Sequence, residues 1–378
     1  MSETVRIGVI GLGVMGKDHL KHIAALENTE LAAVCDVFRA SADHFAAEMN
    51  VPAYYDYHDL LNHQPMDAIL IATPHYDHTP ISIAALGKGL HVLVEKPIAV
   101  QVKDAQQMIT AYQEAKQKYP NLVFGSVFMQ RTYGHWSRIK SLLDEGTLGK
   151  LTRITWIVTD WFRTQAYYDA GTWRATWQGE GGGVLLNQAM HHLDLYQWFF
   201  GMPQRVTGFA GLGKYHHIEV EDEVTAYFEY ANGAIGHFLT STAESPGTNR
   251  LEIVGDSGKL VYENERITLY RNRHSTAERI AQGERSEDAP DYELIDVLYE
   301  QPEHAGHRLM VKNFADAILH GNPLIAPAVN GINPVMLANA ILLSSFERTT
   351  LELPIDADIY AQKLRSLIEA STFKKAAP

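Results

Sequence analysis

Residues 1–128 alternate short apolar runs with longer amphipathic stretches. The runs are rich in β-branched residues and have the length of buried strands, whereas apolar residues recur at helical spacing in the stretches between them. This alternation is typical of a doubly wound parallel sheet with helices on both faces, an α/β Rossmann arrangement. The expected strands are 5–10, 31–35, 68–72, 92–94 and 122–124, and the expected helices are 14–26, 40–49, 81–86 and 105–115.

Beyond residue 128 the pattern changes to strands that follow one another as hairpins. Turn residues such as Asn232-Gly233 and Asp256-Ser257-Gly258 separate them. We therefore expect a dinucleotide-binding domain at 1–128 and an α+β domain at 129–378 that binds substrate and carries a large, mostly antiparallel open sheet. Its expected strands are 154–159, 206–211, 223–230, 234–240, 251–254 and 259–262, its expected helices 310–319 and 335–346, and its expected exposed loop 276–291.

The composition narrows the class of protein. The 378 residues include 32 Lys and Arg against 45 Asp and Glu, a formal charge of −13 that argues against nucleic acid as a partner. The single cysteine, Cys35, excludes an internal disulfide and fits a reducing compartment. The first residues do not read as a secretory signal, and no apolar run has the length of a membrane span. We expect a cytoplasmic protein without a membrane partner.

A glycine-rich loop directly follows the first expected strand. Gly11-Leu12-Gly13-Val14-Met15-Gly16 has the form G-x-G-x-x-G and opens an expected helix. Glycines at these places allow a tight turn, a close approach of backbone to a pyrophosphate, and close helix–strand packing, while the helix N-terminus attracts the phosphates. Asp36 ends the second strand 20 residues after Gly16, which completes the dinucleotide-binding fingerprint.

Asp36 favours NAD over NADP. A carboxylate there accepts hydrogen bonds from a ribose 2′-hydroxyl and repels a 2′-phosphate. Arg39 lies three residues later and offers a positive charge that would offset this repulsion; its other interpretation is a solvated charge on the first helical turn.

Two more loops follow expected strands, where open α/β sheets place their ligands. One is Thr73-Pro74-His75-Tyr76-Asp77-His78, and the other is Glu95-Lys96-Pro97. A lysine at this place can polarise a carbonyl or hydroxyl oxygen. His75 and His78 suggest a metal pair, but no third ligand is placed nearby by the spacing, so we expect no metal and a polar first turn of a helix.

A second group of polar residues lies between Gly181 and Asp194. Asn187 and His191 are four residues apart, so we expect them to share a helical face, with Asp194 three residues beyond as a neighbour of His191. A histidine oriented by a polar neighbour can act as a general acid or base. The adjacent His192 points to another face, which argues against a metal site.

The segment just upstream combines aromatic rings with arginines. Aromatic faces stack on sugar rings and arginines donate fixed hydrogen bonds, but the same composition fits an oligomer contact, and both interpretations stay open. The residues are Trp161, Arg163, Tyr167, Tyr168, Trp173, Arg174 and Trp177.

Taken together, these elements resemble the Gfo/Idh/MocA oxidoreductase family. The resemblance rests on the glycine loop at 11–16, Asp36, Thr73-Pro74, Glu95-Lys96-Pro97 and the segment 181–194. It implies a Rossmann domain, a second domain whose open sheet is often buried in homodimers or homotetramers, and NAD-dependent hydride transfer at a secondary alcohol of a sugar, cyclitol or glycoside.

The resemblance also implies roles for single residues. The family lysine, which touches substrate and nicotinamide, is Lys96, and its peptide bond with Pro97 is cis in many relatives. The family element Asp-x-Gly-x-His-x-x-Asp falls on Asn187, Ala189, His191 and Asp194, so His191 inherits the acid–base role while Asn187 stands in place of an aspartate. An amide cannot carry negative charge, but it can orient a hydroxyl or His191.

The expected site therefore has three sets of residues. The catalytic residues are Lys96, His191 and Asn187. The residues expected at the cofactor are Gly11, Leu12, Gly13, Val14, Met15, Gly16, Asp36, Arg39, Thr73, Pro74, His75, His78, Glu95 and Lys96. Those expected at the carbohydrate-like substrate are Lys96, Arg163, Tyr167, Trp173, Arg174, Asn187 and His191.

Two other functions fit the same residues. One is an NAD-binding regulatory protein without catalysis, which the presence of both Lys96 and His191 disfavours. The other is a glycosidase that recycles its NAD and releases a sugar with no net change in the cofactor.

Overall fold

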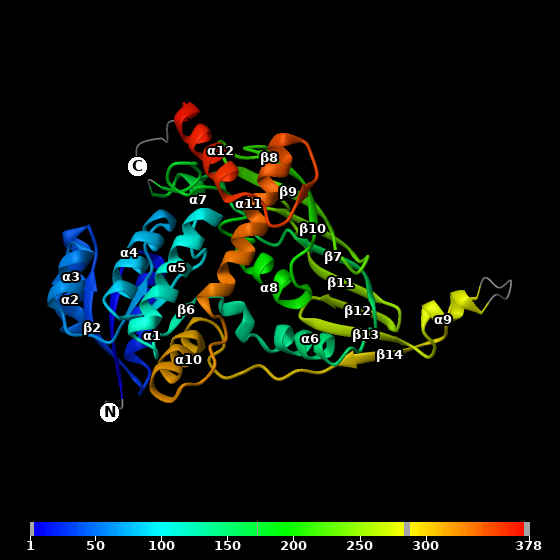
Figure 1. Ribbon diagram of the computed structural model, residues 1–378, viewed down its shortest axis with the longest axis horizontal. Helices are drawn as coiled ribbons and strands as arrows, with labels where there is room; N and C mark the ends of the chain where they lie inside the picture. The colour runs from blue at the N-terminus through cyan, green and yellow to red at the C-terminus, as the bar shows by residue number, and fades with distance from the viewer. Residues whose placement is uncertain (1–3, 172, 283–287, 374–378) are drawn as a thin grey trace.

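The computed structural model describes residues 4–171, 173–282 and 288–373, and these form two sheets. The first sheet is parallel throughout, with strand order β3-β2-β1-β4-β5-β6, which confirms the predicted Rossmann arrangement (Figure 1). Its strands are β1 (Val5–Ile10), β2 (Thr29–Cys35), β3 (Ala53–Tyr54), β4 (Ala68–Ile71), β5 (His91–Val94) and β6 (Phe124–Ser126). Its helices are α1 (Val14–Ala24), α2 (Arg39–Met49), α3 (Tyr57–His63), α4 (His75–Gly87) and α5 (Val102–Lys118).

The strand order reverses between β1 and β4, and this reversal decides where a ligand can bind. Strands β4 and β5 are almost entirely buried, as expected for parallel strands covered on both faces. The chain leaves β1, β4 and β5 at the same edge of the sheet, because parallel strands all end there. The glycine loop, Thr73 and Lys96 therefore lie at one edge, at the switch point.

The second sheet has nine strands in the order β14-β13-β12-β11-β7-β10-β9-β8-β15. All neighbouring pairs are antiparallel except β7 with β10, so the expected mostly antiparallel sheet is confirmed. Asn232-Gly233 turns the chain between β9 and β10, and Gly233 has φ of +87°. The strands are β7 (Leu151–Val158), β8 (Arg205–Leu212), β9 (Glu221–Glu229), β10 (Ile235–Ser241), β11 (Asn249–Gly255), β12 (Gly258–Glu263), β13 (Arg266–Asn272), β14 (Tyr292–Val297) and β15 (Leu351–Glu352).

Helices of the carboxyl-terminal part join the two sheets. Helix α11 packs against β8, α8 and α5, and α10 returns to pack against α1, so both contact the Rossmann helices (Figure 1). These elements are η1 (Met129–Thr132), α6 (Gly134–Asp144), α7 (Gln165–Asp169), α8 (Met190–Phe200), α9 (Thr276–Ala281), α10 (His307–His320), η2 (Ala328–Gly331), α11 (Ile332–Glu347) and α12 (Ala357–Ala370).

Several elements differ from the sequence predictions. The segment expected as an exposed loop begins with α9, which is capped by the Ser275 side chain, while residues 283–287 lie outside the described residues. Strand β14 was not predicted, because it lies at the sheet edge and is mostly exposed, which leaves no clean apolar alternation to detect. Strand β13 was missed although Ile267 and Leu269 alternate with more exposed residues. Helix α4 begins at His75, six residues before the expected helix 81–86, and His75 and His78 lie in its polar first turn.

One apolar segment is longer than the sequence analysis allowed. Ala328–Glu347 is 20 residues long with a mean hydropathy of 1.3, enough by length and composition to cross a membrane. However, 67% of it is buried within the protein, where α11 fills the space between α5 and β8. The segment is therefore better described as a core helix, because α5 and β8 already cover its apolar surface.

A buried ion pair fixes α8 against η1. The Arg131 guanidinium donates two hydrogen bonds to Asp194, at 2.8 and 2.6 Å, and the two side chains are only 2% and 1% exposed. Removing one member of such a pair leaves a buried charge without its partner.

We expect Asp194→Ala to lower the free energy of unfolding by about 3–5 kcal/mol, because Arg131 would remain buried and unpaired. Asp296→Ala is the matched control, since its pair with Arg266 is exposed and should contribute less than about 1 kcal/mol. Urea unfolding followed by circular dichroism measures both. Equal losses in the two variants would contradict this role of the buried pair.

Candidate functional site

The glycine loop after β1 has the shape that a pyrophosphate needs. Gly11 has φ of +90°, and a Cβ on Gly16 would collide with the main-chain oxygen of Gly11, so both positions require glycine. At Gly13, by contrast, a Cβ would meet nothing within 4 Å, so this backbone faces open space at the start of α1. The first turn of α1 contains no acidic residue that would compete for its free N–H groups. These residues fit a dinucleotide.

The Asp36 carboxylate is held in place beside this loop. Its two oxygens accept hydrogen bonds from the backbone N–H groups of Leu12, at 2.7 Å, and Phe38, at 2.8 Å. Phe38, whose backbone N–H donates to this carboxylate, has a side chain that is 74% exposed, so apolar surface lies close by. Arg39 stacks on the Tyr55 ring at 4.0 Å, which agrees with its interpretation as a solvated charge.

The loop after β4 contributes one exposed and two buried groups. Pro74 is exposed, while the Thr73 hydroxyl is buried and has no hydrogen-bond partner among the described residues. His78 is buried, with its ring nitrogens 2.8 Å from the Pro97 oxygen and 2.9 Å from the Thr73 oxygen. His78 thus joins this loop to the one that carries Lys96.

The Glu95 carboxylate supports the backbone at Lys96. Its Oε1 lies 2.7 Å from His19 Nε2, and its Oε2 accepts the Lys96 backbone N–H at 3.1 Å. Burial opposes ionisation of Glu95, but the His19 hydrogen bond and the charges of His19, His307 and Lys96 hold its pKa below the usual value. The Lys96–Pro97 peptide is cis, which confirms the expectation drawn from the family.

The Lys96 side chain crosses from the Rossmann sheet to the second domain. Its Nζ donates a hydrogen bond to the main-chain oxygen of Asn187 at 3.0 Å. Burial lowers the pKa of this ammonium; Glu95 and Glu180 act against that shift, and Arg174 and Arg163 add to it.

His191 lies within the electrostatic reach of Lys96. It is only 5% exposed, near the start of α8, and its ring packs edge-on against Phe128. Burial, followed by the charge of Lys96, holds the pKa of His191 well below its ordinary value. The site therefore pairs a neutral imidazole, a proton acceptor, with a nearby cation.

Two predictions about this segment are wrong. Asn187 and His191 do not share a helical face, because α8 begins only at Met190 and Asn187 lies in the turn before it, its N–H bonded to the Gly183 oxygen at 3.0 Å. Asp194 does not neighbour His191 as a partner, because it is paired with Arg131. Asn187 reaches the site from the turn that follows the three glycines 181–183, and not from a helix.

Two arginines stack on one tyrosine beside the lysine. The guanidinium carbons of Arg163 and Arg174 lie 4.8 and 4.9 Å from the Tyr167 ring centroid, and the Tyr167 hydroxyl accepts a hydrogen bond from Gln188 at 3.1 Å. Trp173 packs edge-on against His75, with ring centroids 5.1 Å apart. The predicted substrate residues of this segment thus form one cluster.

Tyr168 packs edge-on against Tyr167 from the core side, with ring centroids 5.3 Å apart, and Trp177 is also a core residue. Tyr168 and Trp177 are only 2% and 3% exposed. His192 is also buried, and burial lowers its pKa to about 3. Packing rather than chemistry explains these three rings.

Some of the buried polar atoms without partners belong to the same segments. Such atoms are rare in folded proteins because each one loses its hydrogen bonds to water. A bound ligand with several hydroxyl groups would satisfy them. Within the described part of the chain they include Thr73 Oγ1, Trp161 Nε1, Arg163 Nε, Arg174 Nε, Gln188 Oε1 and His191 Nδ1.

The described residues contain no group of three or more His, Cys, Asp or Glu side chains that could hold a metal ion. His75 and His78 lie with ring centroids 6.0 Å apart. Each ring instead has a nitrogen at a main-chain oxygen.

Three residues of this site were not predicted from the sequence. Glu180 directly precedes the three glycines, and its carboxylate accepts a hydrogen bond from the Asn187 amide. Gln188 supports Tyr167, and His19 supports Glu95. His19 lies three residues after Gly16 on the buried face of α1, and this position is the signal that would have found it.

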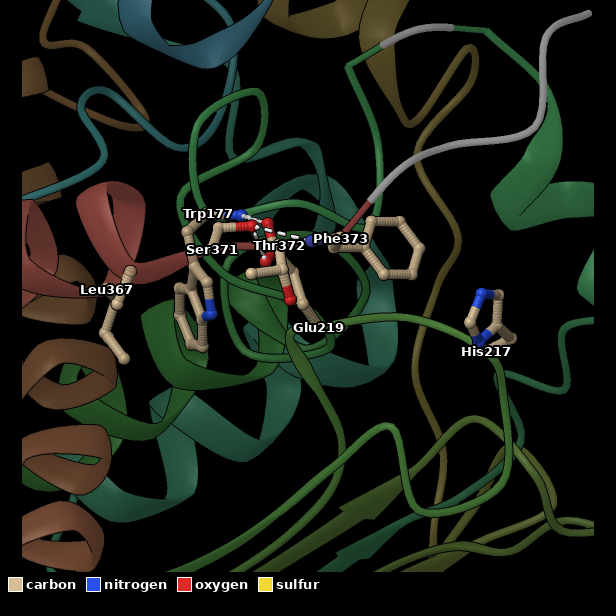
Figure 2. Close-up of a pocket in the computed structure, with 8 residues that line it drawn as sticks. Trp177, His217, Glu219, Leu367, Ser371, Thr372 and Phe373 are labelled. Atoms are coloured by element: carbon tan, nitrogen blue, oxygen red, sulfur yellow. Dashed lines mark hydrogen bonds between the residues drawn. The ribbon is translucent and has the colours of Figure 1, made fainter.

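A separate pocket of about 500 Å³ lies at the end of α12 (Figure 2). Glu219 is central to it, because its carboxylate accepts hydrogen bonds from the Trp177 backbone N–H, at 2.8 Å, and from the Ser371 hydroxyl. The pocket contains neither Lys96 nor His191. Its lining residues are Trp177, His217, Glu219, Leu367, Ala370, Ser371, Thr372 and Phe373.

Curated relatives include dehydrogenases of cyclitols. An inositol 2-dehydrogenase of Salmonella paratyphi B is 33% identical over 152 residues, 39% of this chain and 44% of that protein, so the match spans less than half of that relative. A scyllo-inositol 2-dehydrogenase (NAD(+)) of Bacillus subtilis is 23% identical over 344 residues, 87% of this chain and 91% of that protein.

A solved structure with the same fold is the WlbA dehydrogenase from Bordetella pertussis in complex with NADH and UDP-GlcNAcA. It is 25% identical, with a TM-score of 0.78, and the match covers 93% of this chain and 100% of that chain.

Family models match both parts of the chain. The model described as "Oxidoreductase family, NAD-binding Rossmann fold" matches residues 5–121, and the model described as "GFO/IDH/MocA C-terminal domain" matches residues 136–261. These matches agree with the nucleotide loop, the Lys96 loop and the nine-stranded sheet. The chain therefore belongs to the Gfo/Idh/MocA family of oxidoreductases, with an NAD-binding Rossmann domain at its amino-terminal end.

Proposed function

We propose that the protein is an NAD-dependent dehydrogenase that acts on a secondary hydroxyl group of a sugar, cyclitol or glycoside. The observation that carries this proposal is the approach of Lys96 to Asn187 and His191, across the two domains and next to a dinucleotide loop. Relatives that bear the names of inositol dehydrogenases, and one bound to NADH and a nucleotide sugar, support the same class of substrate.

His191 and Lys96 have different roles at the reacting hydroxyl group. The bound nicotinamide ring supplies the chemistry of hydride acceptance. His191 is neutral and accepts the hydroxyl proton at an imidazole nitrogen, while the Lys96 ammonium stabilises the negative charge that develops on the oxygen. The Gly13 backbone would hold the pyrophosphate of the dinucleotide, and Asp36 would hold the ribose hydroxyl. The Thr73 hydroxyl has no partner among the described residues and could bind the same cofactor.

The cluster around Tyr167 is suited to a ring with several hydroxyl groups. Arg163, Arg174 and Gln188 each have a buried polar atom free for such a group, and Trp173 adds an aromatic surface. We propose that this cluster selects the substrate.

We also propose that the chain acts as a homodimer or homotetramer in the cytoplasm, with a substrate domain that begins near residue 129. Phe209, Leu212 and Tyr215 are 66%, 42% and 52% exposed on and just after β8, so apolar surface remains for a second copy. The buried, unpaired Cys35 fits a reducing compartment. Light scattering on the purified protein would test the assembly.

A substrate screen tests the function itself. Sugars, inositols and glycosides are offered with NAD and with NADP, and absorbance of the reduced cofactor is followed together with release of any aglycone. Reduced cofactor supports a dehydrogenase. Aglycone release without reduced cofactor indicates an NAD-recycling glycosidase, and binding without either product indicates a regulatory protein.

Lys96→Met should lower kcat about 10²–10⁴-fold, the range for loss of one group that handles protons or charge, while the Kd for NAD stays nearly unchanged. Stopped-flow absorbance and calorimetric titration measure the two quantities. Lys88→Met is the control, because this lysine is exposed at the end of α4. Turnover near that of the unmodified enzyme in Lys96→Met would rule out the role.

The pH profile of kcat/KM for oxidation should be bell-shaped. Because the pKa of His191 is depressed below 6.5, the imidazole is neutral at pH 7, and activity should fall only on the acid side of that value as the ring gains a proton. Because the pKa of Lys96 is depressed below 10.5, its charge and the activity should be lost before that pH is reached. His191→Asn should remove the acid limb, and an unchanged acid limb would exclude His191 as the base.

Asp36→Ala should shift the preference between cofactors toward NADP at least about tenfold, equivalent to about 1.4 kcal/mol. The substitution removes the carboxylate that accepts from the ribose and repels a 2′-phosphate. The ratio of kcat/KM for NAD and NADP measures the effect, and Asp43→Ala on the exposed side of α2 is the control. An unchanged ratio would show that Asp36 does not face the ribose.

A further inference from the structure

Glu180 is a buried carboxylate in the site without an assigned role. It is 1% exposed, and among residues 4–171, 173–282 and 288–373 no cationic nitrogen lies within 4.0 Å of it. One oxygen accepts the Ala175 backbone N–H at 2.7 Å, and the other accepts the Asn187 side-chain amide at 2.5 Å. Burial raises the pKa of Glu180, while the hydrogen bonds from Ala175 and Asn187 and the charges of Arg174 and Lys96 oppose that rise. A buried carboxylate with only two neutral hydrogen-bond donors is costly.

The hydrogen bond from Asn187 fixes how its amide lies. Since the amide nitrogen donates to Glu180, the amide oxygen is the end left for a hydrogen-bond donor from another group. The main-chain oxygen of the same residue accepts from Lys96. Asn187 therefore lies between the buried carboxylate and the ammonium group, bonded to both.

The charge of Glu180 also acts on Lys96 directly. Burial favours the neutral amine of Lys96, and Glu95 and Glu180 are the two carboxylates that oppose this effect. The other charged or titratable groups that face the ammonium are cationic or neutral at pH 7. They are Arg163 after β7, Arg174 in the loop before the glycines, His75 on α4, His191 on α8 and His307 on α10.

We propose that Glu180 is a positioning residue whose carboxylate, held behind Asn187, acts on Lys96. The amide oxygen of Asn187 accepts the hydrogen bond of the substrate hydroxyl, and the Glu180 carboxylate behind it helps to keep Lys96 charged. This inference rests on the proposed dehydrogenase function for the hydroxyl contact, but the effect on Lys96 does not depend on turnover.

The first test measures Lys96 without any substrate. Labelling of Lys96 by acetic anhydride, followed by mass spectrometry across pH, reports the fraction of neutral amine. Glu180→Gln should increase labelling at fixed pH about threefold to tenfold, the change for a pKa lower by about half to one unit. Labelling identical to that of the unmodified protein would overturn the proposal, whatever the activity.

Glu219→Gln is the matched control. Glu219 likewise accepts a backbone N–H of the same loop, that of Trp177, but it lies at the separate pocket of Figure 2. If Glu180 only fastened the loop, both substitutions would have similar effects on melting temperature and neither would change Lys96 labelling.

The second test exchanges the two side chains. Asn187→Asp should be harmful, because it places two carboxylates in contact within a buried site. The double variant Glu180→Gln with Asn187→Asp keeps one carboxylate and one amide, and should return Lys96 labelling and kcat toward the original values. The kinetic assay uses NAD with myo-inositol, D-glucose and methyl β-D-glucoside.

The double variant distinguishes failure of the proposed role of Glu180 from failure of the proposed dehydrogenase function. A double variant no better than the worse single variant, in labelling and in kcat, would contradict the proposal. Absence of turnover by the unmodified enzyme on all substrates of the wider screen would argue against the dehydrogenase function, and the labelling result would still decide the role of Glu180.

Discussion

One hydrogen bond between the two domains determines the geometry of the site. Lys96, at the end of β5, reaches the main-chain oxygen of Asn187, in the turn that enters α8. Two other contacts fasten the same loop to the Rossmann domain: the His75 ring lies 3.2 Å from the Glu180 oxygen, and the Tyr76 hydroxyl donates to the Trp177 oxygen at 2.7 Å. These contacts bring the lysine and His191 together, although 95 residues separate them in the chain.

The hydrogen bonds between the Rossmann domain and this loop bury the charged groups of the site, and this burial decides which of them stay ionised. Burial alone would discharge both the ammonium and the carboxylates, because low-dielectric surroundings penalise every isolated charge. Glu95 is held ionised by His19 and its neighbours, whereas burial raises the pKa of Glu180 and the Ala175 and Asn187 hydrogen bonds oppose the rise. The result is a lysine whose charge is favoured by Glu95 and Glu180 against the effect of burial, beside a histidine whose pKa is held well below its ordinary value. A positive charge beside a neutral imidazole is the combination that removal of a hydroxyl proton requires.

The sequence predicted the elements whose signal is local. The glycine loop with Asp36, the Lys96 loop and most strands of the two sheets depend on short patterns of apolar residues and turn residues, and the structure contains them. Edge strand β14 has no comparable signal, because it is mostly exposed and shows no apolar alternation. Helix α12 was missed although its amphipathic spacing and the Asp356 cap are local signals.

The errors at the site have a similar cause. Helical spacing suggested that Asn187 accompanies His191, but three glycines and Ala189, whose N–H bonds to the Val184 oxygen, make a turn there instead. The partner of Asp194 is 63 residues away, so no local pattern reveals it. The role of Glu180 depends on the contact between its carboxylate and the Asn187 amide, and no pattern in the sequence indicates this contact.

The most direct measurement is a crystal structure of the protein with NADH and a bound polyol. Our interpretation predicts that one substrate oxygen lies within about 2.6–3.2 Å of both Lys96 Nζ and a His191 ring nitrogen, with Lys96 still bonded to the Asn187 loop. A closed complex in which the polyol contacts neither nitrogen, or in which Lys96 and His191 face different cavities, would contradict it.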